Sequence, residues 1–332
     1  MLITIDPSGN ILYKSFYIAA LAERFGTVRF LSAPFADLPA EVRGGNRTLF
    51  IAQGEGRERR FAIDGSDQSA VEAALYDWCD VYGHVNANLA LTPSALRPKL
   101  VPLCPSFAVR CWSVPQTLYQ SVRSLPNCQS SVRKHFGKHK RLLQRQPMRA
   151  YGPTEVEQGF VFHCSTLWQS DEWNLNDQEC NLARAWFIRA CKATPGLKFE
   201  GGLVSHRSDL AAKQFADCAI GTAISSARYL ELARRSMFVF NTPAYWGCNG
   251  WKLGEYMALG KAMLTTPLVN DLPEPLVGGV HAHLVDKTSE DIAAGVAYLS
   301  LHPAYCRTLG QNLYQYWQNY GSPQATLKLL GL

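Results

Sequence analysis

The sequence predicts an α/β protein built from two domains, and three observations lead to this fold class. The chain has 332 residues, which is more than one hydrophobic core of usual size accommodates. Its composition, with 47% hydrophobic and 18% charged residues, is that of a folded globular protein and excludes a disordered or collagen-like chain. Strand-like and helix-like stretches alternate in the second half, a pattern typical of βαβ units around a parallel sheet.

In the first half, the alternating segment LITID at residues 2–6 predicts a strand that ends in a Pro-Ser-Gly turn. Apolar residues at helical spacing then predict a helix over residues 13–25. Residues 85–130 are rich in proline and show no clear pattern, whereas residues 131–146 predict a basic helix that Pro147 ends. The other expected elements are strands at 28–32, 48–53 and 59–64 and a helix at 69–80.

In the second half the alternation is regular, and the domain boundary is expected between residues 147 and 158. This division gives an N-terminal domain of residues 1–150 and a C-terminal domain of residues 151–332. The expected strands are 160–166, 198–204, 237–243, 262–268 and 283–286, and the expected helices are 179–193, 225–235, 250–260, 290–301 and 304–320.

Three absences narrow the class of protein. No run approaches the roughly 18–20 apolar residues that span a bilayer, which excludes an integral membrane protein. The opening MLITIDPSGN has no basic segment followed by an apolar one, so no secretory signal is expected. The ten cysteines form no CxxC pair, which favours reduced thiols in a cytoplasmic protein over a zinc or disulfide framework.

Charge is distributed unevenly along the chain. The net charge of +6 divides into +8 for residues 1–150 and −2 for residues 151–332. No acidic residue occurs between Asp80 and Glu155, and seven lysines and arginines lie within Arg133–Arg149. We expect this segment to meet an anionic membrane surface or a phosphate-bearing acceptor. The alternative is a solvated helix that the more acidic C-terminal domain partly neutralises.

Ligands of open parallel sheets bind outside the carboxyl ends of the strands, and three such ends have unusual residues. The first is His163 with the Cys-Ser-Thr that follows it. The second is the pair Gly201 and Gly202, where missing side chains would let the backbone approach a ligand. The third and longest is NTPAYWGCNGWKLGEYMALGKAMLTTPL, residues 241–268.

Within this third segment, Asn249 and Gly250 precede a predicted helix whose free N–H groups suit a phosphate. Glu255 lies one turn after Trp251, and a carboxylate there can accept two hydrogen bonds from the vicinal diol of a ribose. Lys252 offers positive charge to a diphosphate. The alternative interpretation makes Glu255 a solvated helix residue and Trp251 a core residue.

NGWKLGEYMALGKAMLTTPL resembles the E-A-(L/M)-A-x-G-x-P-(V/I) motif of the group 1 glycosyltransferases. The likeness covers residues 160–325 and is strongest over 236–325. It implies the GT-B fold, in which two Rossmann-like domains face each other across a cleft and a C-terminal helix returns towards the N-terminal domain. It further implies that the C-terminal domain binds a nucleoside-diphosphate sugar, with Glu255 on the ribose, and that the acceptor enters over the N-terminal domain.

The chain departs from this family at two positions. Gly247 stands where the retaining family-4 enzymes have a second glutamate on the donor sugar. Ala262 replaces the motif's proline. The resemblance therefore implies nucleotide binding more directly than sugar contacts, and it leaves open whether the reaction retains or inverts the anomeric centre.

Transfer from such a donor requires positive charge to stabilise the departing diphosphate. Lys252, Arg184 and Arg207 are the candidates for this role. No DxD sequence stands beside a strand and no His/Cys cluster has metal-ligand spacing, so no metal and no other cofactor is expected.

An inverting reaction also requires a base for the acceptor hydroxyl. Asp6, at the end of the first strand, and His163 are the candidates, and Asp64 and His84 are weaker ones. The alternative for Asp6 is a turn-forming aspartate in Asp-Pro-Ser-Gly.

The sequence thus predicts a cytoplasmic glycosyltransferase of polysaccharide biosynthesis, acting on a glycan or lipid-linked acceptor at the inner face of the cell membrane. The first alternative is a nucleotide-sugar 2-epimerase of the same fold. The second is a non-enzymatic protein that binds an anionic polymer through the basic segment, although no nucleic-acid-binding motif is present.

Overall fold

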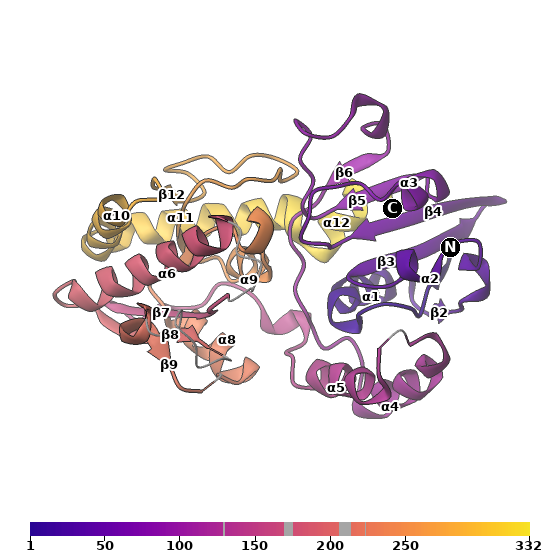
Figure 1. Cartoon of the computed structure of the whole chain (residues 1–332), viewed down its shortest axis with the longest axis horizontal. Coiled ribbons are helices and arrows are strands. Elements are labelled where there is room, and N and C mark those ends of the chain that lie inside the picture. Colours follow the sequence, from indigo (N-terminus) through magenta and orange to yellow (C-terminus); the bar gives the residue numbers. More distant parts are fainter. Residues whose placement is uncertain (129, 169–174, 206–213, 223) are drawn as a thin grey trace. The chain divides into compact units, whose positions relative to one another are not determined.

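The computed structural model describes residues 1–332 except 129, 169–174, 206–213 and 223. The chain divides into two compact units (Figure 1). Unit 1 comprises residues 1–150, 270–274 and 319–332, and unit 2 comprises residues 151–269 and 275–318. The last residues thus belong to unit 1. None of the helices in the described part of the chain has the length and apolar character needed to cross a membrane.

Unit 1 is built on a six-stranded sheet with the order β2-β1-β3-β4-β5-β6. Strand β3 runs antiparallel to both of its neighbours, whereas the other pairs are parallel. Glu55 and Gly56 join β3 to β4 with φ angles of +54° and +72°, the backbone of a tight hairpin turn. The strands are β1 Leu2–Ile5, β2 Val28–Phe30, β3 Arg47–Gly54, β4 Arg57–Asp64, β5 Val81–His84 and β6 Leu100–Pro102.

The helices of unit 1 include those expected over residues 13–25 and 131–146. The expected helix at 69–80 is shorter, since its first four residues precede the helical turn of α3. The region that showed no pattern contains α4. The helices are α1 Ile11–Phe25, α2 Ala40–Arg43, α3 Ala73–Trp78, α4 Val114–Arg123, α5 Val132–Leu143 and α12 Pro323–Leu329.

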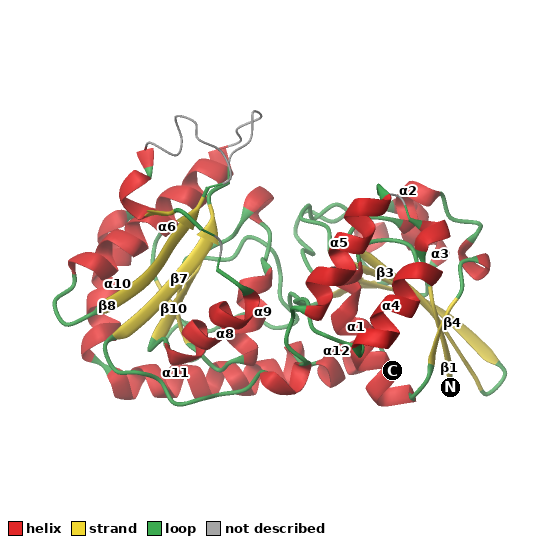
Figure 2. Cartoon of the chain, turned by 90° about the horizontal axis from the view of Figure 1, so that it is seen from below, coloured by secondary structure: helices red, strands yellow, loops and turns green. Residues whose placement is uncertain are grey.

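Unit 2 contains two three-stranded parallel sheets, ordered β7-β8-β9 and β10-β11-β12. They adjoin where the N–H of Met237, just before β10, donates to the carbonyl of Phe160 in β7 at 2.8 Å (Figure 2). The combined order, β9-β8-β7-β10-β11-β12, is that of a doubly wound fold, in which the strand order switches sides between β7 and β10. The strands are β7 Phe160–Thr166, β8 Lys198–Val204, β9 Ala219–Ile220, β10 Phe238–Asn241, β11 Ala262–Thr265 and β12 His283–Leu284.

The core of unit 2 lies between these strands and the long helices. Phe187 of α6 stacks on Phe240 of β10 with ring centroids 4.6 Å apart. All five predicted helices are present within a few residues of their expected bounds. They are α6 Leu175–Ala193, α8 Ser226–Arg235, α9 Trp251–Ala258, α10 Ser289–Leu301 and α11 Pro303–Tyr316.

Candidate functional site

Two cationic side chains lie at the carboxyl end of β7, beside the point where the strand order of unit 2 switches sides. Lys252 comes from the first turn of α9, and its Nζ donates to the carbonyl of Cys164 and to Ser165 Oγ, the latter at 2.6 Å. Arg184 comes from α6 and donates to the carbonyl of Thr166 at 3.1 Å. Two positive charges therefore lie at the end of the central strand, where ligands of this topology bind.

The surroundings of Lys252 disfavour its positive charge. Burial and then the positive charge of Arg184 lower the pKa of Lys252 to about 7, although the negative charge of Glu255 acts in the opposite direction. Arg184 is only 7% exposed. Because both cations have lost most of their hydration, an anion that entered beside them would be bound strongly.

Helix α9 presents the predicted nucleotide-binding residues. Gly250 caps its N-terminus. Glu255 is 7% and Asn249 is 4% exposed, so the alternative that Glu255 is a solvated helix residue is wrong. Trp251, one turn before Glu255, is half-buried, not part of the core. The helix start and these side chains thus lie together, next to Lys252.

His163 lies inside unit 2, and its ring packs near Phe187 and Phe240 at 5.5 and 6.0 Å between centroids. Its Nε2 is 2.7 Å from Ser165 Oγ. Burial, and then the charges of Lys252 and Arg184, hold the pKa of His163 well below its usual value. A neutral His163 orients Ser165, which in turn contacts Lys252; its role as a base remains a prediction.

Gly201 and Gly202 lie inside β8, not at its end. A Cβ on Gly201 would be 2.1 Å from the carbonyl oxygen of His163 in β7, and one on Gly202 would be 2.4 Å from that of Cys218. The close approach of neighbouring strands therefore explains both glycines without a ligand. Arg207, the remaining candidate from this region, falls outside the described residues.

An aromatic group that the sequence reasoning missed lies in unit 2. The rings of Trp168 and Tyr245 are 5.8 Å apart, and those of Tyr245 and Trp246 are 5.5 Å apart. Trp246 is 45% exposed and has a φ of +57°, a conformation that costs a non-glycine residue energy and is found at functional sites. Exposed aromatic faces suit stacking on a base or a sugar. The sequence feature that could have revealed this aromatic group is the Tyr-Trp pair between β10 and α9.

In unit 1, Asp6 follows β1 and is fully buried. Its two carboxylate oxygens each accept a hydrogen bond of 2.9 Å from Arg43, and the N–H of Ser8 donates to it at 3.0 Å. Burial acts to raise the pKa of Asp6, but the hydrogen bond from Arg43 and the charge of Lys14 outweigh it, so the pKa is lowered. Asp6 therefore stays ionised and shapes the loop before α1; its assignment as a base remains a prediction.

This loop borders two neighbouring cavities of about 220 Å³ each. His139 of α5 lines both. Its Nδ1 donates to the carbonyl of His135 at 3.1 Å. One cavity is also lined by Arg123, Lys14 and Trp112. An aromatic ring beside cationic and hydrogen-bonding groups is suited to a sugar or a phosphate ester.

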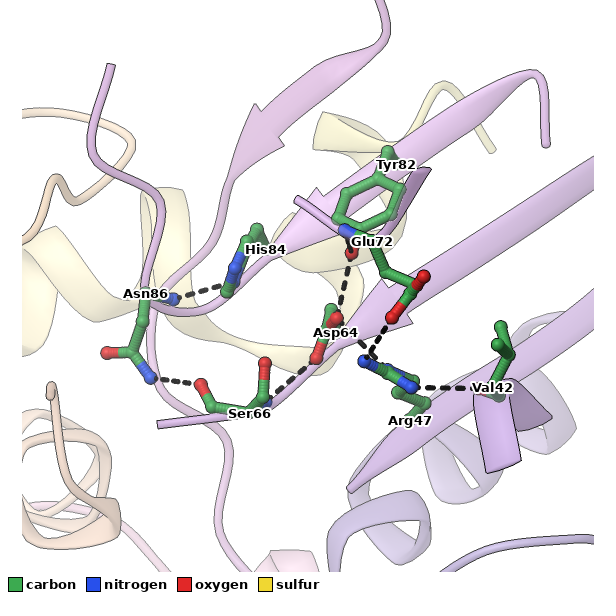
Figure 3. A network of polar contacts seen from close by, with 8 residues as sticks. All are labelled: Val42, Arg47, Asp64, Ser66, Glu72, Tyr82, His84 and Asn86. Carbon is green, nitrogen blue, oxygen red and sulfur yellow. Dashed lines mark hydrogen bonds and ion pairs between the residues drawn. The ribbon is translucent and has the colours of Figure 1, made fainter. Parts of the chain in front are cut away.

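Asp64 and His84 belong to a separate buried network at the ends of β4 and β5 (Figure 3). Asp64 accepts hydrogen bonds from Tyr82 Oη at 2.8 Å and from Arg47 Nε at 3.1 Å. The ring of His84 accepts from the N–H of Asn86, and burial lowers its pKa. Both Asp64 and His84 are 0% exposed and hold the strand ends together; their assignment as weaker candidates for the base remains a prediction.

Within the described ranges, no three His, Cys, Asp or Glu side chains gather as they do around a metal ion.

The chain is similar, at low sequence identity, to three proteins of solved structure. The C-terminal domain of a group 1 glycosyl transferase family protein (LpcC) from Francisella tularensis is 18% identical, with a TM-score of 0.39, over 53% of this chain and 97% of that one. A glycosyltransferase from Rickettsia africae is 10% identical, with a TM-score of 0.44, over 96% and 79%. TarM is 10% identical, with a TM-score of 0.44, over 81% of this chain but only 48% of its own. No protein-family model and no curated protein matches the sequence.

Proposed function

We propose that the protein is a glycosyltransferase of GT-B type and that unit 2 binds its nucleoside-diphosphate sugar. The observation that carries this proposal is a pair of cations, the partly buried Lys252 and the buried Arg184, at the end of the central strand β7 beside the start of α9. A diphosphate is the anion that suits two cations and a helix N-terminus at this place in a doubly wound sheet.

In the proposed reaction the diphosphate is the leaving group, and negative charge accumulates on it as the bond to the sugar breaks. Lys252, Arg184 and the N–H groups at the start of α9 are fixed before the reaction, so they stabilise this charge without reorganising. Glu255, on the second turn of α9, accepts hydrogen bonds from the ribose hydroxyls. Trp168 or Trp246 stacks on the base or the sugar.

The acceptor is proposed to be a glycan or a lipid-linked sugar of polysaccharide biosynthesis, bound in the cavities of unit 1. The cavity walls support this, because Trp112 can pack on a sugar ring while Arg123 and His139 hydrogen-bond to its oxygens. Asp6 is the proposed base if the reaction inverts the anomeric centre. We place the reaction in the cytoplasm, with the basic segment Arg133–Arg149 turned towards an anionic membrane.

The first test is the substitution Glu255→Gln, which keeps the shape of the side chain but removes its charge. We expect the folded variant to bind nucleoside diphosphates more weakly by about 1.5–3 kcal/mol, the usual contribution of a hydrogen bond to a charged group. The ligand is first chosen by thermal shift from uridine, guanosine, adenosine and thymidine diphosphates, and affinity is then measured by calorimetry.

Glu231→Gln is the matched control, because Glu231 is exposed on α8 and forms only surface ion pairs. We expect its affinity to equal that of the wild type. If Glu255→Gln also binds as tightly as the wild type, Glu255 does not hold the ribose.

Incubating the donor sugar without an acceptor separates a transferase from the alternative of a 2-epimerase, because only the epimerase would still form product.

The second test concerns metal ions. Because Lys252 and Arg184 supply positive charge at the proposed diphosphate position, we expect sugar transfer to continue in excess EDTA. Activity is measured as nucleoside diphosphate released in the presence of acceptor. Loss of turnover in EDTA, with recovery on adding Mg²⁺ or Mn²⁺, would show that a divalent ion performs this function.

A further inference from the structure

Helix α4 in unit 1 buries polar side chains and exposes apolar ones, the opposite of the usual arrangement. Its buried residues are Thr117 and Ser121. Each hydroxyl donates to a carbonyl of its own helix or N-cap, at 2.9 and 2.7 Å, which satisfies it in the interior. Large apolar side chains face solvent instead: Leu118 is 63% and Val122 is 56% exposed. An apolar stripe on the outer face of a helix marks an interaction surface.

The neighbouring helix α5 also exposes apolar side chains. Residues four apart lie on one face of a helix, and here Val132 is 57% and Phe136 is 37% exposed, with the exposed Lys140 next in the same row. The two helices pack against each other (Figure 2). We call this surface the α4–α5 face; its apolar members are Val114, Leu118, Tyr119, Val122, Val132 and Phe136.

Cations surround these apolar side chains. Residues 114–143 contain six lysines and arginines and no acidic residue. On α5, Arg133, Lys134, Lys140 and Arg141 are exposed. The buried face of α5 is formed by His139 and Leu142, so the charged side chains are left to the outside. The α4–α5 face is therefore both apolar and strongly cationic.

We propose that the α4–α5 face is a membrane-binding surface that inserts its apolar side chains at the interface of an anionic bilayer. Apolar residues with surrounding cations and no acid are the combination that helices lying in a bilayer interface use. A second copy of this chain fits poorly, because two such faces would bring like charges together.

This inference deepens the proposed location at a membrane and goes beyond electrostatic attraction alone, since it assigns the apolar contact to α4. The same two helices contribute Arg123, His135 and His139 to the cavities of unit 1, so a lipid-linked acceptor would find its sugar site beside its anchor. The inference does not depend on the sugar transfer, and its test uses neither nucleotide nor sugar.

The experiment is co-sedimentation of the full chain with vesicles of phosphatidylcholine alone and of phosphatidylcholine with phosphatidylglycerol, at low and high salt. We expect binding to the anionic vesicles that weakens with salt. Leu118→Gln with Val122→Gln should lower partitioning by about tenfold through lost apolar insertion. Lys140→Gln with Arg141→Gln should lower it by about 30-fold, since each cation contributes about fivefold.

Leu301→Gln is the matched control, because Leu301 is 76% exposed at the end of α10 in unit 2. It should bind vesicles as the wild type does. Circular dichroism identifies any variant that has lost its fold. Wild-type protein that ignores anionic vesicles at low salt would overturn the proposal. So would undiminished binding by Leu118→Gln with Val122→Gln, or a dimer in light scattering that this variant dissociates.

Discussion

Replacing Gly201 by alanine is expected to reduce the free energy of unfolding by about 4 kcal/mol. The added Cβ would lie 2.1 Å from the carbonyl oxygen of His163, its register partner in β7. Gly201 also has a φ of +110°, which alanine rarely adopts. Backbone strain and overpacking each cost about 1–3 kcal/mol, and together they approach the total stability of many domains.

The measurement is chemical denaturation followed by circular dichroism. Gly221→Ala is the matched control, because nothing lies within 4 Å of a Cβ at that position, and its stability should remain close to that of the wild type. If Gly201→Ala unfolds at the same denaturant concentration as the wild type, the strand approach does not require glycine. The interpretation of Gly201 as a residue that admits a ligand would then regain its basis.

Nucleotide binding is expected to take up a proton at Lys252. The pKa of this amine is about 7 in the free protein, chiefly through burial, and a neighbouring diphosphate would raise it. Affinity should therefore be greatest below pH 7, where the amine is already protonated in the free protein, and fall as pH rises above 7, by up to about tenfold per unit. The nucleotide itself adds little to this trend, because its terminal phosphate ionises near pH 6.

Calorimetry in buffers of different ionisation enthalpy detects this proton uptake directly. Lys252→Met should abolish it and weaken binding at pH 7 by about ten- to a hundredfold. Lys261→Met is a close control, because Lys261 is also buried, has a pKa of about 7 and donates to the carbonyl of Arg234. Proton uptake that persists in Lys252→Met, or is lost in Lys261→Met, would remove Lys252 from the nucleotide site.

The elements of unit 2 were predictable because its strands are buried on both faces and read as apolar runs between regular helices. The bounds of β7 and β8 agree with those expected from the sequence. Strand order was not predictable, since pairing joins segments far apart in the chain. The antiparallel hairpin of β3 and β4 is a local pairing, and its sequence signal is the short turn between the segments 48–53 and 59–64, not either segment alone.

Helix α4 was missed for a different reason. A pattern of apolar residues predicts a helix when those residues face the core, whereas Leu118 and Val122 face outwards. A local signal was present: Ser113 and Gln116 form a reciprocal capping box at its start, a pattern that specifies a helix N-terminus independently of burial.

Only part of the candidate site could be predicted from the sequence. Lys252, Glu255 and Gly250 were recognisable from the motif around α9, because they lie within six residues of one another. The partners of Lys252 on β7, and the packing of Trp168 near Tyr245, join distant segments and required coordinates. Gly201 and Gly202 were assigned to a ligand because a sequence does not distinguish a glycine that admits a ligand from one that admits a neighbouring strand.

Because residues 319–332 pack within unit 1, the newly synthesised chain cannot complete its two units in the order in which they are translated. Helix α12 packs against α1, and Leu330 lies close to Gly83 in β5. Domains usually fold in the order in which they emerge from the ribosome. Here unit 1 emerges first but lacks its last helix until all of unit 2 has been made. Unit 2 can therefore complete its core while unit 1 still exposes the surface that α12 covers, so a chaperone would be expected to act on unit 1, the part translated first.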